Sequence, residues 1–282
     1  MQLIQSWLFV PGHRQSMIDK AHGLGADALI FDLEDGVPPA EKETARAQIA
    51  TTLDADSTSL FVRTHPANHA DLTNDLEAIV RPGLTGLVLP KVNAAEEIVH
   101  LSAALEERER QANIPAGQIR LLALIETARG LIQAPAIAAA NPRMAGLLFG
   151  AEDFALDTHA DAADDFLYAR SALIVATAST GIQAVDRAHL DLHDTHALSA
   201  STRQSRRLGF TGRLLIHPDQ ITPVHDAFRP SADEVGYAQR VVEASDQDCG
   251  SIVIDGRMVD LPVVERARET LYLYNRRNTE TP

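Results

Sequence analysis

The stretch ADALIFDLEDG, residues 26–36, places a run of small and apolar residues directly before three carboxylates, Asp32, Glu34 and Asp35. Such a nearly continuous apolar run is typical of a parallel strand that is covered on both faces. Clustered carboxylates repel one another and lose hydration when buried, so solvent, cationic side chains or a metal ion must compensate them. The stretch therefore predicts a buried strand whose carboxyl end meets a polar site.

Seven further short apolar segments recur along the chain, with helix-like sequence between several of them. Helices are expected over residues 39–53, 94–112, 128–140, 165–180 and 196–208, and glycines such as Gly181 and Gly209 are the expected helix stops. The apolar segments are SWLFVPG (6–12), LFVRTHP (60–66), GLVLPKV (86–92), RLLALIETA (120–128), GLLFGAEDF (146–154), GIQAVD (181–186) and GRLLIHP (212–218).

Eight strands that alternate with helices match an α/β fold of the TIM (β/α)8 barrel type in number and length. The alternative is a doubly wound open sheet. The first strand lacks the G-x-G-x-x-G turn that marks dinucleotide-binding sheets of that kind. The pattern therefore favours the barrel.

The chain after residue 228 departs from this rhythm. Residues 231–247 predict a helix, residues 251–260 predict a hairpin around Asp255-Gly256, and residues 261–277 predict a closing helix. We expect a catalytic barrel domain over residues 1–228. The helical and hairpin extension over residues 229–282 is expected to make oligomer contacts and to cover a neighbouring site.

Composition excludes several functional classes. The formal net charge of −14 opposes nucleic-acid binding, which needs a basic surface. The sequence has no apolar run near the roughly 20 residues of a membrane span, and its N-terminus does not resemble a signal peptide. The single Cys249 excludes an internal disulfide framework. A cytoplasmic enzyme without nucleic-acid or membrane partners fits these features.

Polar residues follow the predicted strands, and TIM-barrel sites lie at those strand ends. Glu126 follows five apolar residues, and Asp153 ends the next apolar segment. Neighbouring parallel strands lie about 4.8 Å apart, so we expect the two carboxylates to share an ion. Oxygen ligands suit Mg²⁺, whereas no His or Cys stands at zinc spacing. The alternative is a structural ion pair between Glu126 and Arg63 or Lys91.

Small and cationic residues near these acids suit an anionic substrate. Gly150 and Ala151 let backbone N–H groups approach a ligand closely. The guanidinium of Arg63 favours bidentate carboxylate binding, although it can equally neutralise the acidic cluster. The histidines, His65 and His69 among them, show no constellation, and we expect them at the surface or in the core.

Ten stretches together resemble the citrate lyase beta-subunit family, which includes malyl-CoA and citramalyl-CoA lyases. They are SWLFVPGHR, DALIFDLEDGV, FVRTHP, LVLPKV, ALIETARGL, LLFGAEDFALD, YARSALIVA, GIQAVD, LGFTGRLLIHPDQI and DGRMVDLPVVERA. The resemblance covers nearly the whole chain. It implies a TIM barrel assembled as homotrimers or hexamers. It also implies Mg²⁺-dependent cleavage of a 3-hydroxy-3-carboxylated acyl thioester into an oxo-acid and an acyl thioester of CoA or an acyl carrier.

The resemblance also implies roles for individual residues. Glu126 and Asp153 match the two metal ligands, and Arg63 matches the arginine that grips the oxo-acid. Asp260 matches a proton-transferring aspartate that reaches the neighbouring subunit's site. Positions near the thioester carrier correspond to Phe9, Lys20, Ile216 and His217. At least one of Asp32, Glu34 and Asp35 is expected to hydrogen-bond a metal-bound water.

Asp35 marks a departure from another branch of the barrel family. The hydroxy-oxo-acid aldolases that share the fold place His at this position, so an aldolase mechanism with a His base is disfavoured.

Three alternatives remain at this point. One is the beta subunit of a citrate lyase complex that acts on a citryl group carried by an acyl carrier protein. Another is a thioester hydrolase. The last is a non-catalytic scaffold or ligand sensor, which the presence of Glu126, Asp153, Arg63 and Asp260 argues against.

Overall fold

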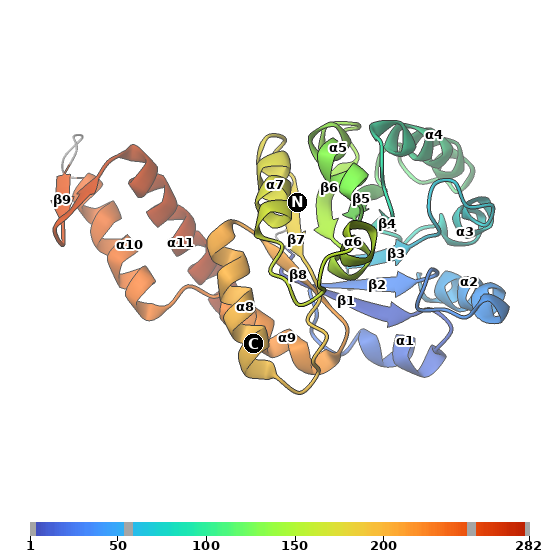
Figure 1. Ribbon diagram of the computed structural model, residues 1–282, viewed down its shortest axis with the longest axis horizontal. Coiled ribbons are helices and arrows are strands. Elements are labelled where there is room, and N and C mark those ends of the chain that lie inside the picture. Colours follow the sequence, from blue (N-terminus) through green and yellow to red (C-terminus); the bar gives the residue numbers. More distant parts are fainter. Residues whose placement is uncertain (1–3, 54–58, 247–251, 280–282) are drawn as a thin grey trace. The chain divides into compact units, whose positions relative to one another are not determined.

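The computed structural model describes residues 4–53, 59–246 and 252–279 (Figure 1). The chain divides into two compact units, Met1–Val224 and His225–Pro282, and each is described by itself. Cys249 and the edges of two predicted segments, residues 247 and 251, lie outside the described residues.

The first unit contains a closed barrel of eight parallel strands, in which β1 pairs with both β2 and β8. The predicted barrel is therefore confirmed, and the doubly wound open sheet is wrong. The strands are β1 (Ser6–Pro11), β2 (Ala28–Asp32), β3 (Ser59–Arg63), β4 (Gly86–Leu89), β5 (Arg120–Ile125), β6 (Met144–Phe149), β7 (Gln183–Asp186) and β8 (Gly212–Leu215).

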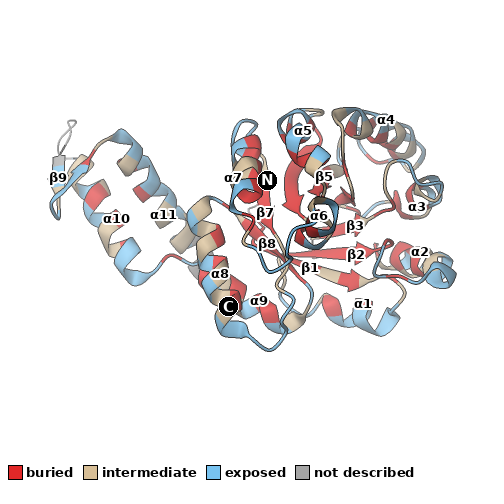
Figure 2. Ribbon diagram, in the orientation of Figure 1, coloured by how far each residue is buried: buried red, intermediate tan, exposed pale blue. Residues whose placement is uncertain are grey.

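Helices surround the barrel, with their outward faces exposed and the strands buried (Figure 2). They are α1 (Gln15–Ala21), α2 (Lys42–Thr52), α3 (Leu72–Ile79), α4 (Ala95–Gln111), α5 (Ala128–Ala138), α6 (Ala151–Thr158), α7 (Leu167–Ala178), α8 (Thr195–Leu208) and α9 (Ile221–Phe228), with 3-10 turns η1 (Pro39–Glu41) and η2 (Pro218–Gln220). The five helices predicted in this unit are present, although the first begins as η1. Helices α1, α3, α6 and α9 were not predicted.

Large apolar side chains fill the inside of the barrel. Trp7 and Phe61 meet edge to face with ring centroids 4.9 Å apart, and Ile30, Leu122 and Leu148 pack with them at 0% exposure. Alternate residues of each strand point inward, so every strand contributes to this filling. Because the interior is packed, a ligand can enter only at an end of the barrel.

The second unit is a helical hairpin with a short β-ribbon. Helix α10 (Ala232–Ser245) begins at a capping box, in which Glu234 N–H donates to Ser231 Oγ and Ser231 N–H donates to Glu234 Oε2. Strands β9 (Ile252–Ile254) and β10 (Arg257–Val259) pair antiparallel around Asp255 and Gly256, both at positive φ as a two-residue hairpin turn requires. Helix α11 (Leu261–Thr279) closes the unit, so the three predicted elements are confirmed.

None of the helices in the described part of the chain combines the length and apolar character that crossing a bilayer requires.

Candidate active site

A cavity of about 330 Å³ opens at the carboxyl end of the barrel strands. All of its lining residues belong to the barrel unit. An apolar wall comes from Phe9, Pro11, Leu124, Phe149, Ala188, Leu190, Leu214 and Ile216, and a polar wall comes from Asp32, Gly36, Arg63, Glu126, Gly150, Ala151, Glu152 and Asp153. The cavity therefore offers carboxylates, a guanidinium and apolar surface to one ligand.

Glu126 follows β5 directly and is 2% exposed. The backbone N–H of Lys91 donates to Glu126 Oε1 at 2.7 Å, from a left-handed conformation with φ of +54°. In the described part of the chain, Glu126 forms no ion pair with Arg63 or with the Lys91 side chain. The structural ion pair left open by the sequence is therefore wrong.

Burial, together with the neighbouring carboxylates of Asp153 and Glu34, raises the pKa of Glu126 to about 8. The anionic form is thus poorly compensated by the protein alone. Oxygen donors that gather negative charge beside a cavity fit a hard divalent cation such as Mg²⁺. Glu126 and Asp153 are the residues that would hold it.

Asp153 reaches the cavity from a different element than expected. Strand β6 ends at Phe149, and Asp153 lies in the first turn of α6 rather than at a strand end. The prediction that two strand-end carboxylates lie at equal height is therefore wrong. The continuous apolar character of GLLFGAEDF concealed the change from strand to helix at Gly150.

Gly150 is required by the close approach of Glu126. A Cβ atom at position 150 would lie 2.6 Å from Glu126 Oε2 and 2.8 Å from Glu126 Cβ. Gly150 also stands immediately before α6 and has no side chain that caps this helix. The positive end of the helix dipole therefore lies at the cavity, which Gly150 and Ala151 line.

Arg63 and Asp32 form a buried pair beside this pocket. Arg63 Nε donates to Asp32 Oδ1 at 2.7 Å and Nη2 donates to Oδ2 at 2.6 Å. Burial by itself raises the pKa of Asp32, but Arg63 and the backbone N–H groups of Glu34 and Gly36 outweigh it and lower the pKa. Asp32 thus occupies Nε and Nη2 of Arg63, which is also a lining residue of the cavity.

Glu34 and Asp35 are compensated by cations as well. Glu34 forms ion pairs with Arg63 Nη1 at 3.0 Å and Lys91 Nζ at 2.8 Å, and Asp35 lies 3.1 Å from Lys91 Nζ. The side chains of Arg63 and Lys91 therefore compensate the carboxylates at the end of the stretch ADALIFDLEDG. A hydrogen bond from one of them to a metal-bound water stays a prediction.

The residues expected near a thioester carrier divide into two groups. Phe9 and Ile216 line the cavity, and Arg63 lies over the Phe9 ring at 4.9 Å from its centroid. Lys20 is exposed in the last turn of α1, and His217 Nδ1 accepts the backbone N–H of Asp219 at 3.2 Å. Neither of these two is among the lining residues of the cavity.

Asp260 belongs to the second unit. It precedes α11, and its carbonyl accepts the backbone N–H groups of Val263 and Val264 at 3.0 Å. Its side chain is half-buried. The proposed contact with a neighbouring subunit therefore concerns a residue at the start of a helix.

Two parts of the cavity were not predicted from the sequence. Ala188 and Leu190 of the apolar wall lie in the connection after β7, where no periodicity marks them. The backbone N–H of Lys91 was missed because its direction depends on a positive φ, which is rare outside glycine. The only sequence feature that indicated a role for Lys91 in the site is its position directly after an apolar strand.

The closed barrel defines the chain as a TIM-barrel protein with a cavity lined by carboxylates at the carboxyl end of its strands. The family model described as HpcH/HpaI aldolase/citrate lyase matches residues 5–218. The chain belongs to this family, within the branch of citrate lyase beta subunits.

Individual relatives cover nearly the whole chain. The citrate lyase subunit beta of Leuconostoc mesenteroides subsp. cremoris is 36% identical over 97% of this chain and 94% of its own. The mitochondrial citramalyl-CoA lyase of Homo sapiens is 30% identical over 94% of this chain and 84% of its own.

Solved structures of citrate lyase beta-subunit relatives have the same fold as this chain. Protein CitE from Mycobacterium tuberculosis, in complex with magnesium, acetoacetate and coenzyme A, matches with a TM-score of 0.84 and 32% identity over 97% of this chain and 98% of its own. The citrate lyase beta subunit from M. tuberculosis, complexed with oxaloacetate and magnesium, matches with a TM-score of 0.70 and 33% identity over 80% of this chain and 98% of its own.

Proposed function

We propose that this chain is a Mg²⁺-dependent carbon–carbon lyase. Its substrate would be a 3-hydroxy-3-carboxylated acyl thioester of the citryl-, malyl- or citramalyl-CoA type, cleaved to an oxo-acid and an acyl thioester, or formed from them. The observation that carries the proposal is the cavity that brings Glu126 and Asp153 together beside Arg63 and the N-terminus of α6. Family membership and the magnesium complexes of relatives support the same chemistry.

Glu126 and Asp153 would hold Mg²⁺ through carboxylate oxygens. When bound there, Mg²⁺ supplies Lewis acidity toward the oxygens of an oxo-acid. The backbone N–H of Lys91 holds Oε1 of Glu126, which fixes the carboxylate and leaves Oε2 beside Gly150.

The remaining groups would orient the acid and receive developing charge. In the cleavage direction a base takes the hydroxyl proton, the C–C bond breaks to give the oxo-acid, and its electron pair remains on the thioester as an enolate that is then protonated. Arg63 and the first N–H groups of α6 are fixed positive groups close to the forming charge, which is the most effective form of electrostatic stabilisation. Asp32 would keep Arg63 in place.

Asp260 of a neighbouring copy is proposed to transfer the proton. Of the carboxylates that line the mouth cavity, all but the exposed Glu152 are paired with Arg63 or assigned to the metal, so the proton-transferring acid is proposed to come from a second copy. A homotrimer or hexamer would provide this arrangement. Phe9 and Ile216 would contact the thioester carrier at the apolar wall, and Lys20 and His217 would contact it farther out.

The decisive experiment is a panel of citryl-, malyl- and citramalyl-CoA incubated with the protein and Mg²⁺, with products identified by mass spectrometry. We expect one thioester to give an oxo-acid and a shorter acyl-CoA, and EDTA to stop the reaction. Hydrolysis to free CoA without C–C cleavage would contradict the proposal and favour a thioester hydrolase.

A second candidate is the beta subunit of a citrate lyase complex, since curated citrate lyase beta subunits match at 35–36% identity over 95–97% of this chain. This subunit would act on a citryl group carried by an acyl carrier protein. Cleavage of the carrier-bound group but not of free citryl-CoA would support this second candidate.

Mixing two inactive variants tests the role of a second copy. Asp260→Ala and Glu126→Gln should each be inactive alone, but a co-refolded mixture should regain activity because some cavities then combine an intact Glu126 with an intact Asp260. Light scattering on the same samples gives the oligomeric state. A mixture without activity would contradict the shared site.

A further inference from the structure

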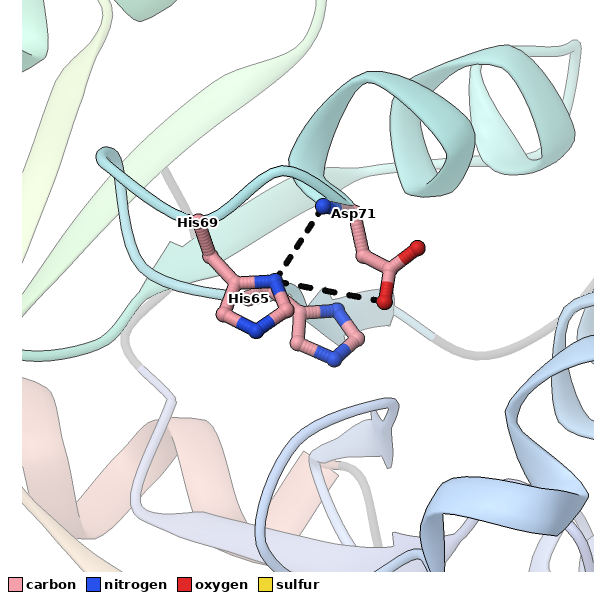
Figure 3. A group of neighbouring side chains, drawn as sticks. All are labelled: His65, His69 and Asp71. Atoms are coloured by element: carbon pink, nitrogen blue, oxygen red, sulfur yellow. Dashed lines mark hydrogen bonds and ion pairs between the residues drawn. The ribbon is translucent and has the colours of Figure 1, made fainter.

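A second group of potential metal ligands lies outside the mouth cavity, in the segment that follows β3. His65, His69 and Asp71 each offer one ligand atom, and these atoms lie within 4.8 Å of one another. Figure 3 shows the two imidazole rings stacked, with the Asp71 carboxylate beside the ring of His69. One of the two histidines is buried and the other exposed, as expected, but the structure brings them together where the sequence indicated no constellation.

The ring of His65 is oriented by a buried acid. His65 Nδ1 lies 2.7 Å from Asp75 Oδ2, and Asp75 is 0% exposed. Asp75 also accepts the backbone N–H of His65 and pairs with Arg46 Nε at 2.8 Å, so it is anionic and acts as the acceptor. Because Nδ1 contacts Asp75, Nε2 is the ring nitrogen of His65 that would bind a metal ion. A carboxylate behind one ring nitrogen is the usual support of a metal-bound histidine.

Asp71 is held in a similar way. Its Oδ1 accepts from Asn74 Nδ2 at 3.0 Å and pairs with Arg46 Nη2 at 3.1 Å. The other oxygen, Oδ2, faces His69 Nδ1 at 4.0 Å. One oxygen thus fixes the side chain, while the second remains directed toward the two rings.

His69 is the exposed histidine of the group, and its ring would have to move for a metal ion to bind. Its Nδ1 accepts the backbone N–H of Asp71 at 3.1 Å and therefore carries a lone pair rather than a proton. Bonds of about 2.1 Å in tetrahedral geometry would place two donors about 3.4 Å apart. The two rings are stacked with their planes 19° apart, so metal binding requires His69 to turn out of the stack and release the Asp71 N–H. With its side chain 48% exposed, His69 has room for that rotation.

We propose that His65, His69 and Asp71 form a binding site for a divalent transition-metal ion, with Zn²⁺ as the preferred ion. Two imidazoles and one carboxylate favour Zn²⁺ over Mg²⁺, which prefers oxygen ligands. Three protein ligands leave a fourth position for water or an exogenous ligand, and the group borders a cavity of about 590 Å³.

This site is distinct from the mouth cavity. Among the described residues, the two cavities share no lining residue. Glu34 and Lys91 line the cavity of the histidine group, and Arg63, which lines the mouth, pairs with Glu34. The acidic cluster therefore separates the two positions, and the proposal does not depend on the lyase activity.

The test is Zn²⁺ binding by the full chain after removal of metals, measured by equilibrium dialysis with elemental analysis. Glu126→Gln serves as the host, because it weakens the oxygen-ligand site. We expect the host to bind one Zn²⁺ more than the same protein carrying His69→Ala or Asp71→Asn. His193→Ala, which removes an exposed histidine elsewhere, is the matched control and should keep the ion.

Cobalt gives an independent readout. Co²⁺ added to the host should give visible absorption bands that His69→Ala removes and His193→Ala retains. Equal Zn²⁺ content in the host and the His69→Ala protein would overturn the proposal, as would Co²⁺ bands unaffected by that change. Circular dichroism of each variant establishes that the fold is intact.

Discussion

Two sets of carboxylates meet at the mouth of this barrel, and the protein treats them differently. Asp32, Glu34 and Asp35 are paired with Arg63 and Lys91. Glu126 and Asp153 form no ion pair in the described part of the chain, and Glu126 has a pKa raised to about 8. The first set is compensated within the fold, whereas the second has no cationic partner among the described residues. This difference is why the proposed metal site is placed at Glu126 and Asp153 and not at the other carboxylates.

Removing the second set should have the largest effect. Glu126→Gln and Asp153→Asn are each expected to abolish Mg²⁺-dependent turnover, because each removes a metal ligand. The free energy of unfolding without metal should change by less than about 1 kcal/mol, since an isosteric amide relieves carboxylate repulsion. Enzyme assays and urea denaturation measure the two effects. Glu107→Gln, an exposed glutamate, is the control, and retained turnover in either variant would refute the assignment.

Substituting an acid of the first set should instead lower the stability of the fold. Asp32→Asn leaves the buried Arg63 without its bidentate partner, and the loss of one member of such a pair costs about 3–5 kcal/mol. Urea denaturation should show this loss. A change below about 1 kcal/mol would mean that Arg63 finds compensation elsewhere.

The same pair predicts a pH dependence. The pKa of Asp32 is lowered in the folded state, so its stabilisation is complete above the ordinary value of about 3.9 and is lost as the pH falls through the folded value. Asp32→Asn should therefore weaken the acid dependence of unfolding.

Added Mg²⁺ should stabilise the folded protein through the second set of carboxylates, an effect smaller than the losses above. At a concentration 100 times its Kd, the ion should stabilise the wild-type protein by about 2.7 kcal/mol, because it binds only the folded state. Thermal unfolding with and without Mg²⁺ measures this shift. Glu126→Gln should lose the shift, and a Glu107→Gln protein should keep it.

Lys91 connects the two sets, and its substitutions should have the smallest effect. Its side chain pairs with Glu34 and Asp35, while its backbone N–H holds Glu126 from a positive φ. Lys91→Ala keeps the left-handed penalty of about 1 kcal/mol that lysine already has at this position, whereas Lys91→Gly removes the penalty and retains the N–H. The glycine variant should therefore be the more stable and show the lower Mg²⁺ requirement; equal behaviour would argue against backbone positioning.

Much of the fold follows from sequence pattern. The eight strands were predicted because each is a nearly continuous apolar run, and continuous runs are what strands buried on both faces require. The short helices α1, α3 and α6 were missed, since seven or eight residues show little more than two turns of periodicity. Asp153 was predicted at a strand end for the same reason, because the short helix α6 begins within an apolar segment.

The site itself was only partly predictable. Glu126, Arg63 and Asp32 reach one cavity because barrel topology brings strand ends together, and Asp153 reaches it from the first turn of α6. The bidentate Arg63–Asp32 pair and the His65–His69 stack depend on side-chain directions beyond the strand ends. No periodicity in the sequence specifies those directions, so the geometry was needed to find them.

The close contact between Gly150 and Glu126 means that a single added methyl group at position 150 should abolish catalysis. A Cβ at Gly150 would occupy space that Oε2 of Glu126 now fills, so alanine there would displace the carboxylate while leaving its charge and the barrel core in place. Such a protein would be a folded, catalytically silent copy in which an intact thioester substrate can be trapped and crystallised.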